Sequence, residues 1–316
     1  MIRDLVTIAI PVRNGMPRLA ELLDAVAAQR VDAEVELLVA DSGSSDGSRE
    51  AAVAHGARIV DVEPGTFSHG GTRNLLMREA EGAHVAFLTQ DAVPASDEWL
   101  ARLLEGFELA PEVSLVYGPY LPRPGASVMV ARELTQFFAG MAPDGRPRVD
   151  VGLAEGDRRP GPVTFFTDAN GCVARWAWER IPYRAVPYAE DQLLATEMLE
   201  AGFAKAYMPR AGVVHSHDYP PVERFRRFFD EFRALREVYG HVEKVGLRHT
   251  LGTIRRNVAR DRGWAQAHGG GEVALESATF HTVRAAGAAL GTRADQLPSA
   301  LRRALSLEGR STFEPI

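Results

Sequence analysis

The feature that most limits the fold of this chain is the alternation of short β-branched runs with helical patterns between residues 5 and 118. Between the runs, apolar residues recur at helical spacing, as at Leu19, Leu22, Leu23 and Val26. The expected strands cover residues 6–11, 35–41, 57–62, 84–89 and 113–117. This rhythm predicts an α/β fold with a largely parallel, doubly wound sheet.

The rest of the chain divides into an insertion, a second ordered block and a helical tail. Residues 121–162 are rich in Pro, Gly and Arg and predict a loop-rich insertion, with one helix near 128–138. In the ordered block that follows, we expect a helix from Glu190 to Gly202. The tail is expected to be helical after Pro221, with a break at the glycines of 268–271.

The composition excludes several classes of protein. The 316 residues are 46% hydrophobic, which is enough to bury a large core. A net charge of -6 and a single cysteine, Cys172, argue against a nucleic-acid partner and an internal disulfide. The apolar run at 5–10 is too short for a signal peptide, and no run reaches the roughly 18 residues of a membrane span. We therefore expect the chain in the cytoplasm.

Polar residues directly follow three of the expected strands. They are the segments at 11–15 and 41–47 and the carboxylate Asp91. Open α/β sheets bind ligands outside the carboxyl ends of their strands, so these residues predict a ligand site. Asp41 can accept hydrogen bonds from a base or a ribose, although its Ser-rich loop is also typical of a helix cap.

Six motifs follow one another along the chain. They read IAIPVRNG at 8–15, VADSGSSDG at 39–47, FSHGGTRN at 67–74, LTQDA at 88–92, AEDQ at 189–192 and VHSHDY at 214–219. In this order they resemble the motifs of family 2 glycosyltransferases. The segments at 69–74 and 215–219 are most similar to those of bacterial rhamnosyltransferases.

The resemblance implies a GT-A fold, with a Rossmann-like mixed sheet flanked by helices. Together with the patterns above, it predicts a catalytic domain at 1–219 and a helical C-terminal extension at 220–316. Within the catalytic domain we expect a nucleotide-binding half at 1–118 and an acceptor-binding half at 119–219. The implied reaction is a direct displacement with inversion at the anomeric carbon.

A nucleotide site follows from the same resemblance. Its residues would be Pro11, Arg13, Asn14, Asp41, Arg73, Gln90 and Asp91. Arg73 is expected in this site for a physical reason as well, because a guanidinium forms charge-assisted hydrogen bonds with a diphosphate. The alternative for Arg73 is a surface arginine in the first turn of a helix.

The metal site of the family has lost one ligand in this chain. Gln90-Asp91-Ala92 stands in the place of the family's Asp-X-Asp motif, and the second carboxylate is absent. The resemblance implies that His215 or His217 completes the site, and His215 is the better match. Mg²⁺ or Mn²⁺ is expected as the cofactor, because the phosphates of the donor supply further oxygen ligands. A structural histidine is the alternative.

Inversion in one step requires a general base, since a sugar hydroxyl is a poor nucleophile at neutral pH. The resemblance assigns this role to Asp191 and a supporting role to Glu190, and the reverse assignment stays open. Acids at a helix start are also favoured by the helix dipole alone. Asp168 and Asn170 would contact the donor sugar and the acceptor, or else form a turn.

The expected donor is a dTDP- or UDP-sugar, with L-rhamnose as the leading sugar. The acceptor would be a hydroxyl of a glycan, a lipid-linked glycan or a small molecule. The alternative function is a catalytically silent, nucleotide-sugar-binding subunit of a polysaccharide assembly complex, because the second carboxylate is missing.

One helix of the tail carries an aromatic stripe. The stripe consists of Phe225, Phe228, Phe229, Phe232 and Leu235, with basic residues beside it. It either packs onto the catalytic domain or a second subunit, as in a homodimer, or lies on anionic lipid. The second alternative would place the enzyme peripherally on the inner face of the plasma membrane.

Overall fold

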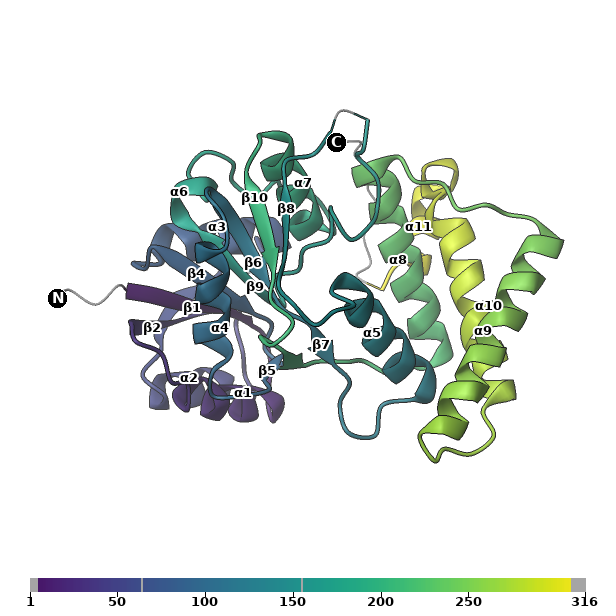
Figure 1. The fold of residues 1–316 in the computed structure, drawn as a ribbon, viewed down its shortest axis with the longest axis horizontal. Helices are drawn as coiled ribbons and strands as arrows, with labels where there is room; N and C mark the ends of the chain where they lie inside the picture. The colour runs from purple at the N-terminus through teal and green to yellow at the C-terminus, as the bar shows by residue number, and fades with distance from the viewer. Residues whose placement is uncertain (1–4, 64, 155, 308–316) are drawn as a thin grey trace. The chain divides into compact units, whose positions relative to one another are not determined.

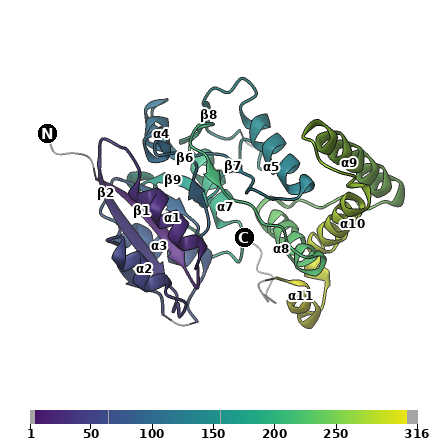
Figure 2. The same cartoon turned by 90° about the horizontal axis from the view of Figure 1, so that it is seen from below.

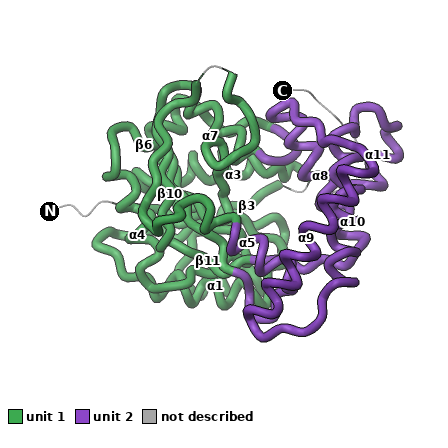
Figure 3. Tube along the Cα trace, turned by 45° about the vertical axis from the view of Figure 1, so that its right-hand side comes forward, with its two compact units in different colours: residues 1–121, 137–185, 190–215 green, residues 122–136, 186–189, 216–316 purple. Residues whose placement is uncertain are grey.

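The computed structural model describes residues 5–63, 65–154 and 156–307, and Figure 1 shows their fold. The expected domain ends at residues 1 and 316 lie outside these residues, as does the segment that precedes Leu5. Two compact units are present, coloured separately in Figure 3. The first consists of Met1–Leu121, Phe137–Ala185 and Glu190–His215, and the second of Pro122–Gln136, Val186–Ala189 and Ser216–Ile316.

The first unit is built on two β-sheets (Figure 1). Its strands are β1 (Leu5–Val12), β2 (Glu34–Asp41), β3 (Arg58–Asp61), β4 (His84–Leu88), β5 (Val93–Pro94), β6 (Val113–Tyr117), β7 (Tyr120–Leu121), β8 (Arg148–Val151), β9 (Asn170–Ala174), β10 (Ala204–Tyr207) and β11 (Val213–Val214). In the described part of the chain, an eight-stranded sheet has the order β3-β2-β1-β4-β9-β6-β10-β8, and a three-stranded sheet has the order β5-β11-β7.

Helices flank the larger sheet and make up most of the second unit. In the first unit they are α1 (Arg18–Ala27), α2 (Ser48–Ala54), α3 (His69–Glu79), α4 (Trp99–Glu105), α6 (Arg175–Trp178) and α7 (Glu190–Glu200). Helix α5 (Val128–Met141) begins in the second unit and ends in the first. The second unit also holds α8 (Pro221–Tyr239), α9 (Leu247–Ala267), α10 (Ala274–Gly291) and α11 (Ser299–Leu305). Two short 3-10 helices lie at Gly106–Glu108 and Ala294–Gln296.

The five expected strands are confirmed as β1, β2, β3, β4 and β6. The sheet is mixed, because β9 runs antiparallel between β4 and β6, and β8 runs antiparallel to β10. Every residue of β9 is buried, since the strand has neighbours on both sides. The α/β architecture and the helical C-terminal region are therefore as predicted.

The core of the first unit forms where α1 meets the larger sheet. The apolar face of α1 is buried, as its helical spacing predicted, and packs with Ile8 and Ile10 of β1. Trp99, the first residue of α4, is fully buried in the same cluster. Burying this many large apolar side chains stabilises the sheet and fixes the positions of the loops that follow its strands.

In the second unit the aromatic stripe of α8 packs against α10. The two helices approach closely at two glycines of α10, because a Cβ on Gly291 would lie 2.4 Å from the carbonyl oxygen of Phe229. A Cβ on Gly287 would lie 2.9 Å from the carbonyl oxygen of Phe225. Phe229 is fully buried. The other four residues of the stripe are half-buried, so the stripe contributes to the contact between α8 and α10 and keeps part of its surface outside that contact.

The start of α5 belongs to the second unit because it is ion-paired with the C-terminal helices. Arg132 pairs with the buried Asp261 of α9, and Glu133 Oε2 lies 2.8 Å from Arg284 Nη1 of α10. His281 Nε2 lies 2.8 Å from Asp261 Oδ2.

Among the described residues, no helix combines the length and the apolar character that crossing a bilayer requires.

Candidate active site

Three loops at the carboxyl ends of β1, β2 and β4 are joined by hydrogen bonds. The amide of Asn14 donates to Ser44 Oγ at 3.0 Å, and Asn14 Oδ1 accepts from the amide of Ser45 at 2.9 Å. Asn14 has a φ of 51°, which asparagine tolerates better than most residues. The amide of Arg13 donates to Gln90 Oε1 at 2.8 Å. The three strand ends therefore form one continuous edge.

Other expected nucleotide residues lie on the same edge. Asp41 is buried, and its carboxylate accepts a hydrogen bond from the amide of Ser44 at 3.2 Å. Arg49 Nη1 lies 3.5 Å from Asp41 Oδ2. Pro11 is half-buried, whereas Arg13 is exposed. Asp41 thus closes its own loop without capping α2, whose N-cap is Gly47, and the Arg13 side chain is open to solvent.

Asp91 lies beside His215, a residue from a distant part of the chain. Strand β11 pairs antiparallel with β5, with Val214 opposite Val93. His215 Nδ1 lies 3.5 Å from Asp91 Oδ1, and the ring of Tyr120 meets the His215 ring edge-on at 5.0 Å between centroids. A carboxylate and an imidazole therefore meet where the second carboxylate of the motif is absent.

Two further residues bear on this pair. Arg18, the first residue of α1, has Nη1 3.7 Å from Asp91 Oδ2. His217 is exposed and follows His215 by two residues, at the start of the second unit. Asp91, His215 and His217 carry oxygen and nitrogen atoms of the kinds that hold a divalent metal ion.

A second group of charged residues is centred on Arg73 of α3. Arg73 Nε lies 2.6 Å from Asp168 Oδ2, and Arg73 Nη1 lies 2.7 Å from Glu190 Oε1. The Tyr183 hydroxyl donates to Asp168 Oδ1 at 2.7 Å. The amide of Asp168 donates to Asp191 Oδ2 at 3.3 Å. The chain thus gathers three carboxyl groups near one guanidinium, and we name these five residues the Arg73 cluster.

Burial raises the pKa of two acids in the Arg73 cluster. It is the largest influence on Asp168 and raises the pKa of that carboxyl to about 6, while Arg73 acts in the opposite direction. For Asp191, burial and then the charges of Glu190 and Asp168 raise the pKa to about 8. Burial lowers the pKa of Arg73, but the neighbouring carboxylates outweigh it and hold that pKa above its ordinary value.

The two adjacent acids at the start of α7 have different partners. Glu190 is buried and forms the ion pair with Arg73. Asp191 is half-buried, and Asp191 Oδ1 accepts a hydrogen bond from the amide of Gln192 at 2.8 Å. No cation of the described residues lies within 4.0 Å of its carboxylate. Of the two acids, Glu190 is therefore the one that is ion-paired in the described part of the chain.

The surroundings of Arg73 overturn the surface alternative for this residue. Its side chain is only 7% exposed, so it is not a surface arginine of the first helical turn. Its guanidinium is held by Asp168 and Glu190, so its charge is already balanced by two carboxylates. Arg73 therefore contacts the acids of the cluster in this structure, and its role at a diphosphate stays a prediction.

Asn170 and Asp168 also differ from the expected sugar-binding residues. Asn170 is fully buried, and its amide donates to the carbonyl oxygens of Pro119 at 3.1 Å and Ala211 at 2.8 Å. Asn170 Oδ1 accepts from the indole of Trp99 at 2.7 Å. Because these contacts use its hydrogen-bonding groups, Asn170 ties strand ends together. Asp168 is likewise fully buried and holds Arg73.

Sequence reasoning missed Tyr183 and Arg18. Tyr183 is held by Asn74, which accepts from its amide at 3.1 Å and donates to its carbonyl oxygen at 2.8 Å. It lies in a segment without periodicity, so no pattern singled it out. Arg18 could have been predicted from the sequence. It lies in the first helical turn after the motif at 8–15, and its side chain lies near Asp91 at the same strand edge.

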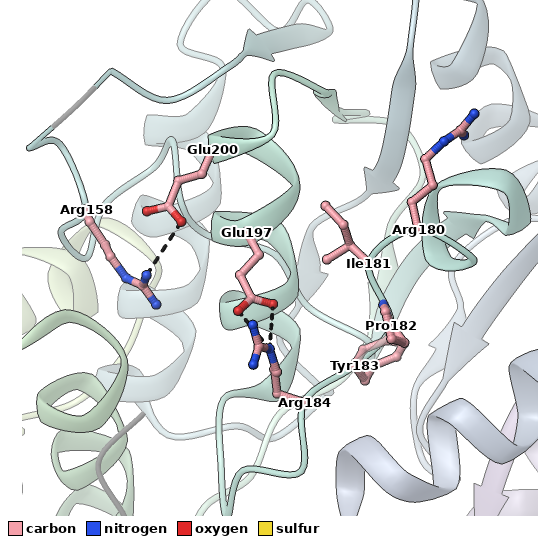
Figure 4. A pocket seen from close by; sticks show the side chains of 8 residues that line it. All are labelled: Arg158, Arg180, Ile181, Pro182, Tyr183, Arg184, Glu197 and Glu200. Carbon is pink, nitrogen blue, oxygen red and sulfur yellow. Dashed lines mark hydrogen bonds and ion pairs between the residues drawn. The ribbon is translucent and has the colours of Figure 1, made fainter.

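A cavity of about 580 Å³ lies beside Tyr183 and α7 (Figure 4). It is lined by Arg158, Arg180, Ile181, Pro182, Tyr183, Arg184, Glu197 and Glu200. Arg158 Nη1 lies 3.5 Å from Glu200 Oε2, and Arg184 Nε lies 3.0 Å from Glu197 Oε1. Its charges are thus largely paired, and Tyr183 is the one residue that it shares with the Arg73 cluster.

The mixed sheet, with its acids at the strand ends and at the start of α7, is the arrangement of the GT-A glycosyltransferases. The family model described as "Glycosyl transferase family 2" matches residues 7–142. The O-antigen chain rhamnosyltransferase RfbN of Salmonella typhimurium is 30% identical over 230 residues, which are 71% of this chain and 70% of the relative. WbaN of Salmonella anatum, with the same description, is 30% identical over 231 residues and the same shares of both chains. The chain belongs to glycosyl transferase family 2 and is a glycosyltransferase.

A solved structure supports the fold. The mannosyltransferase PcManGT from Pyrobaculum calidifontis, in complex with GDP-Man and Mn²⁺, has a TM-score of 0.60 with this chain. The alignment covers 92% of this chain and 87% of that chain, at 18% identity. At this level of identity the likeness bears on the fold and not on the substrate.

Proposed function

We propose that this glycosyltransferase moves a sugar from a nucleoside diphosphate to an acceptor hydroxyl by single displacement, with inversion at the anomeric carbon. The observation that carries the proposal is the different pairing of Glu190 and Asp191. Glu190 is engaged by Arg73 at 2.7 Å, whereas Asp191 is partly open and has no ion-pair partner among the described residues.

Asp191 is the general base of the proposed reaction. The acceptor oxygen forms its bond to the anomeric carbon while the bond to the diphosphate oxygen breaks, and Asp191 takes the hydroxyl proton. A base works best when its pKa lies near the working pH. The surroundings that raise the pKa of Asp191 to about 8 therefore suit the role, provided that the pH is high enough to ionise it.

Glu190 and Asp168 support the base indirectly. Both are buried on Arg73, and the amide of Asp168 donates to Asp191 Oδ2 at 3.3 Å. This contact fixes the carboxylate orientation, which matters because small displacements of a base are costly to the rate. We propose Arg73, Asp168 and Glu190 as positioning residues.

We propose that the loop edge binds the nucleotide, through Pro11, Arg13, Asn14, Asp41 and Gln90. These residues lie on three loops that share hydrogen bonds, so the edge is pre-formed. Arg13 supplies an exposed cation on this edge. A pre-formed site binds its ligand at a lower ordering cost.

A divalent cation fits beside this edge, at Asp91 and His215. Carboxylate oxygen and imidazole nitrogen form a mixed donor set that suits Mn²⁺ better than Mg²⁺, which prefers oxygen ligands. His217 is within reach of the same ion, because two residues of extended chain span at most about 7 Å. When bound, such an ion neutralises the charge that develops on the departing diphosphate. Arg18, 3.7 Å from Asp91, adds a second positive charge for the phosphates.

For the substrates we propose L-rhamnose as the sugar, carried on dTDP or UDP. The support is the identity to two relatives that are described as O-antigen chain rhamnosyltransferases. The acceptor would be a glycan hydroxyl, either free or lipid-linked, in the assembly of a polysaccharide.

The test combines donor binding with two single variants. Purified protein is titrated with a panel of nucleoside diphosphate sugars, each with Mn²⁺, with Mg²⁺ and with chelator, and thermal stabilisation is recorded. Asp191→Asn should keep donor affinity and lower kcat by about a hundredfold or more, as removal of a general base does. Glu190→Gln should lower kcat less, because it leaves the base in place.

Three outcomes would redirect the proposal. A loss of donor affinity in Asp191→Asn would remove Asp191 from the base role, and a larger fall in kcat for Glu190→Gln would reverse the assignment. Donor binding without transfer to any acceptor of a glycan panel would point to a nucleotide-sugar-binding subunit of an assembly complex.

A further inference from the structure

The segment from Lys244 to Arg260 carries only positive charge. Its cations are Lys244, Arg248, Arg255, Arg256 and Arg260, and no Asp or Glu lies between them, although the whole chain has a net charge of -6. No carboxylate of the described residues lies within 4.0 Å of any of these cations. Positive charge is therefore gathered in one place on an acidic protein.

Large apolar side chains protrude among these cations. Leu247 is 77% exposed, Val245 is 62% exposed and Leu251 is 50% exposed. Val242, just before them, is 41% exposed. Single exposed apolar residues are ordinary, but four within ten residues form an apolar patch of the kind that marks an interaction site.

The geometry of α9 keeps this patch turned away from the helical core. Its buried residues are Asp261 and Ala265, near its C-terminal end, where Asp261 accepts from Ser277 and His281 of α10. Helix α10 lies between α8 and α9 (Figure 2). The first half of α9 extends beyond this buried contact and leaves Arg248, Leu251 and Arg255 exposed at the i, i+3, i+7 spacing of one helix face.

We propose that the surface formed by Val242, Val245, Leu247, Leu251 and the five cations binds the anionic face of a lipid bilayer. We name it the α9 surface. Cations on one side of a helix attract acidic headgroups, while the apolar side chains between them enter the boundary of the acyl chains. A nucleic acid would use the cations alone, and a protein groove would use the leucines alone, so the combination favours lipid.

This inference is independent of the proposed reaction, because the α9 surface shares no residue with the proposed active site. It assigns the helical unit a purpose: holding the enzyme at a membrane. An acceptor attached to lipid is reached faster by an enzyme confined to the same surface, since the search takes place in a thin layer. The aromatic stripe of α8 packs against α10 and is not part of the α9 surface.

The experiment is sedimentation with vesicles of phosphatidylcholine alone or with 30 to 40 mole per cent phosphatidylserine, roughly the range in which surface charge is strong. The wild-type protein should sediment with the anionic vesicles and not with the neutral ones. Arg248→Gln with Arg255→Gln should weaken binding about thirtyfold, since each basic residue contributes about a fivefold gain. Leu247→Gln with Leu251→Gln should weaken it by at least about tenfold.

Matched variants separate the α9 surface from overall charge and hydrophobicity. Arg78→Gln with Arg146→Gln removes two exposed cations elsewhere, and Val53→Gln with Leu109→Gln removes two exposed apolar side chains elsewhere. Neither control should change sedimentation, and thermal unfolding of all variants should match the wild type.

Several results would overturn the inference. They are failure of the wild-type protein to bind anionic vesicles, equal loss of binding in the control variants, and undiminished binding in both α9 variants. Binding to duplex DNA or RNA in place of vesicles would reassign the α9 surface to a nucleic acid. Self-association that the α9 variants abolish, without vesicle binding, would reassign it to a second copy of the chain.

Discussion

The buried position of Arg73 gives a strong test of the site, because the two roles considered for this residue predict losses of stability that differ greatly in size. Arg73→Met removes the cation and leaves Asp168 and Glu190 buried at the distances of 2.6 and 2.7 Å that Arg73 now occupies. Breaking a buried ion pair from one side costs about 3–5 kcal/mol of unfolding free energy. A diphosphate-binding arginine open to solvent would cost less than about 0.5 kcal/mol.

The loss of stability in Arg73→Met should also depend on pH, and its direction follows from the pKa of Asp168. Burial raises the pKa of its carboxyl from 3.8 to about 6 even beside Arg73, which corresponds to about 3 kcal/mol. An acid whose folded pKa is raised binds more protons when folded, so stability falls as the pH rises through that window. Without Arg73 the folded pKa rises further. The stability gap between wild type and variant should therefore widen from pH 4 to pH 8.

The assay is urea denaturation at half-unit intervals of pH, followed by tryptophan fluorescence. Arg78→Met is the matched control, because Arg78 is exposed and lies on the same helix. Arg73→Lys should be intermediate, since a lysine keeps the charge but lacks the rigid, planar set of donors with which arginine contacts both carboxylates. If Arg73→Met is as stable as Arg78→Met at pH 8, or if the gap narrows with rising pH, the description of the Arg73 cluster is wrong.

Three further predictions concern the acid pair, the metal site and the strand ends. The kcat/KM of the wild type should rise about tenfold per pH unit toward a plateau above the pKa of about 8 of Asp191, and a profile that is flat between pH 6 and pH 8 would exclude this base. His215→Ala should weaken Mn²⁺-dependent donor binding, measured by calorimetry, by about ten- to a hundredfold. Asp91→Ala should weaken this binding further. Unchanged metal dependence in both variants would show that these residues do not form the metal site. Asn170→Ala should cost about 2–4 kcal/mol in urea denaturation, because the Trp99 indole and two carbonyl groups lose partners, and a stable variant with a changed KM would restore Asn170 as a sugar-binding residue.

The regular elements could be predicted because their signals are local. The helix that carries Leu19 and Leu22 has a period of 3.6 residues, and β1 and β2 are rich in aliphatic and β-branched residues. Strand β8 was missed although Arg148–Val151 alternates between polar and apolar residues, since four residues inside a loop-rich segment are too few to stand out. The direction of β9 was unpredictable for another reason: five buried residues carry no information about their neighbours.

The sequence predicted where the candidate site residues lie in the fold, but not which of them contact one another. Motif order indicated Asp91, Glu190 and Asp191, which do lie at strand ends and at the start of a helix. Arg73 and Glu190 are 117 residues apart, and no local pattern joins them. In the same way, His215 reaches Asp91 only through the pairing of β11 with β5. Tertiary contacts of this kind decide which donors and charges remain available to a ligand.

The acid pair shows how strongly function depends on such contacts. Glu190 and Asp191 share the first turn of α7, where the helix dipole favours any carboxylate, so helix position alone would make them equivalent. Arg73 breaks the equivalence, because its guanidinium contacts Glu190 and not Asp191. For Asp191, burial and the charges of the two neighbouring acids raise the pKa more than Arg73 lowers it, which favours the protonated form. A single cation from α3 thus gives two adjacent acids different surroundings, and its removal should reduce that difference as well as the stability of the fold.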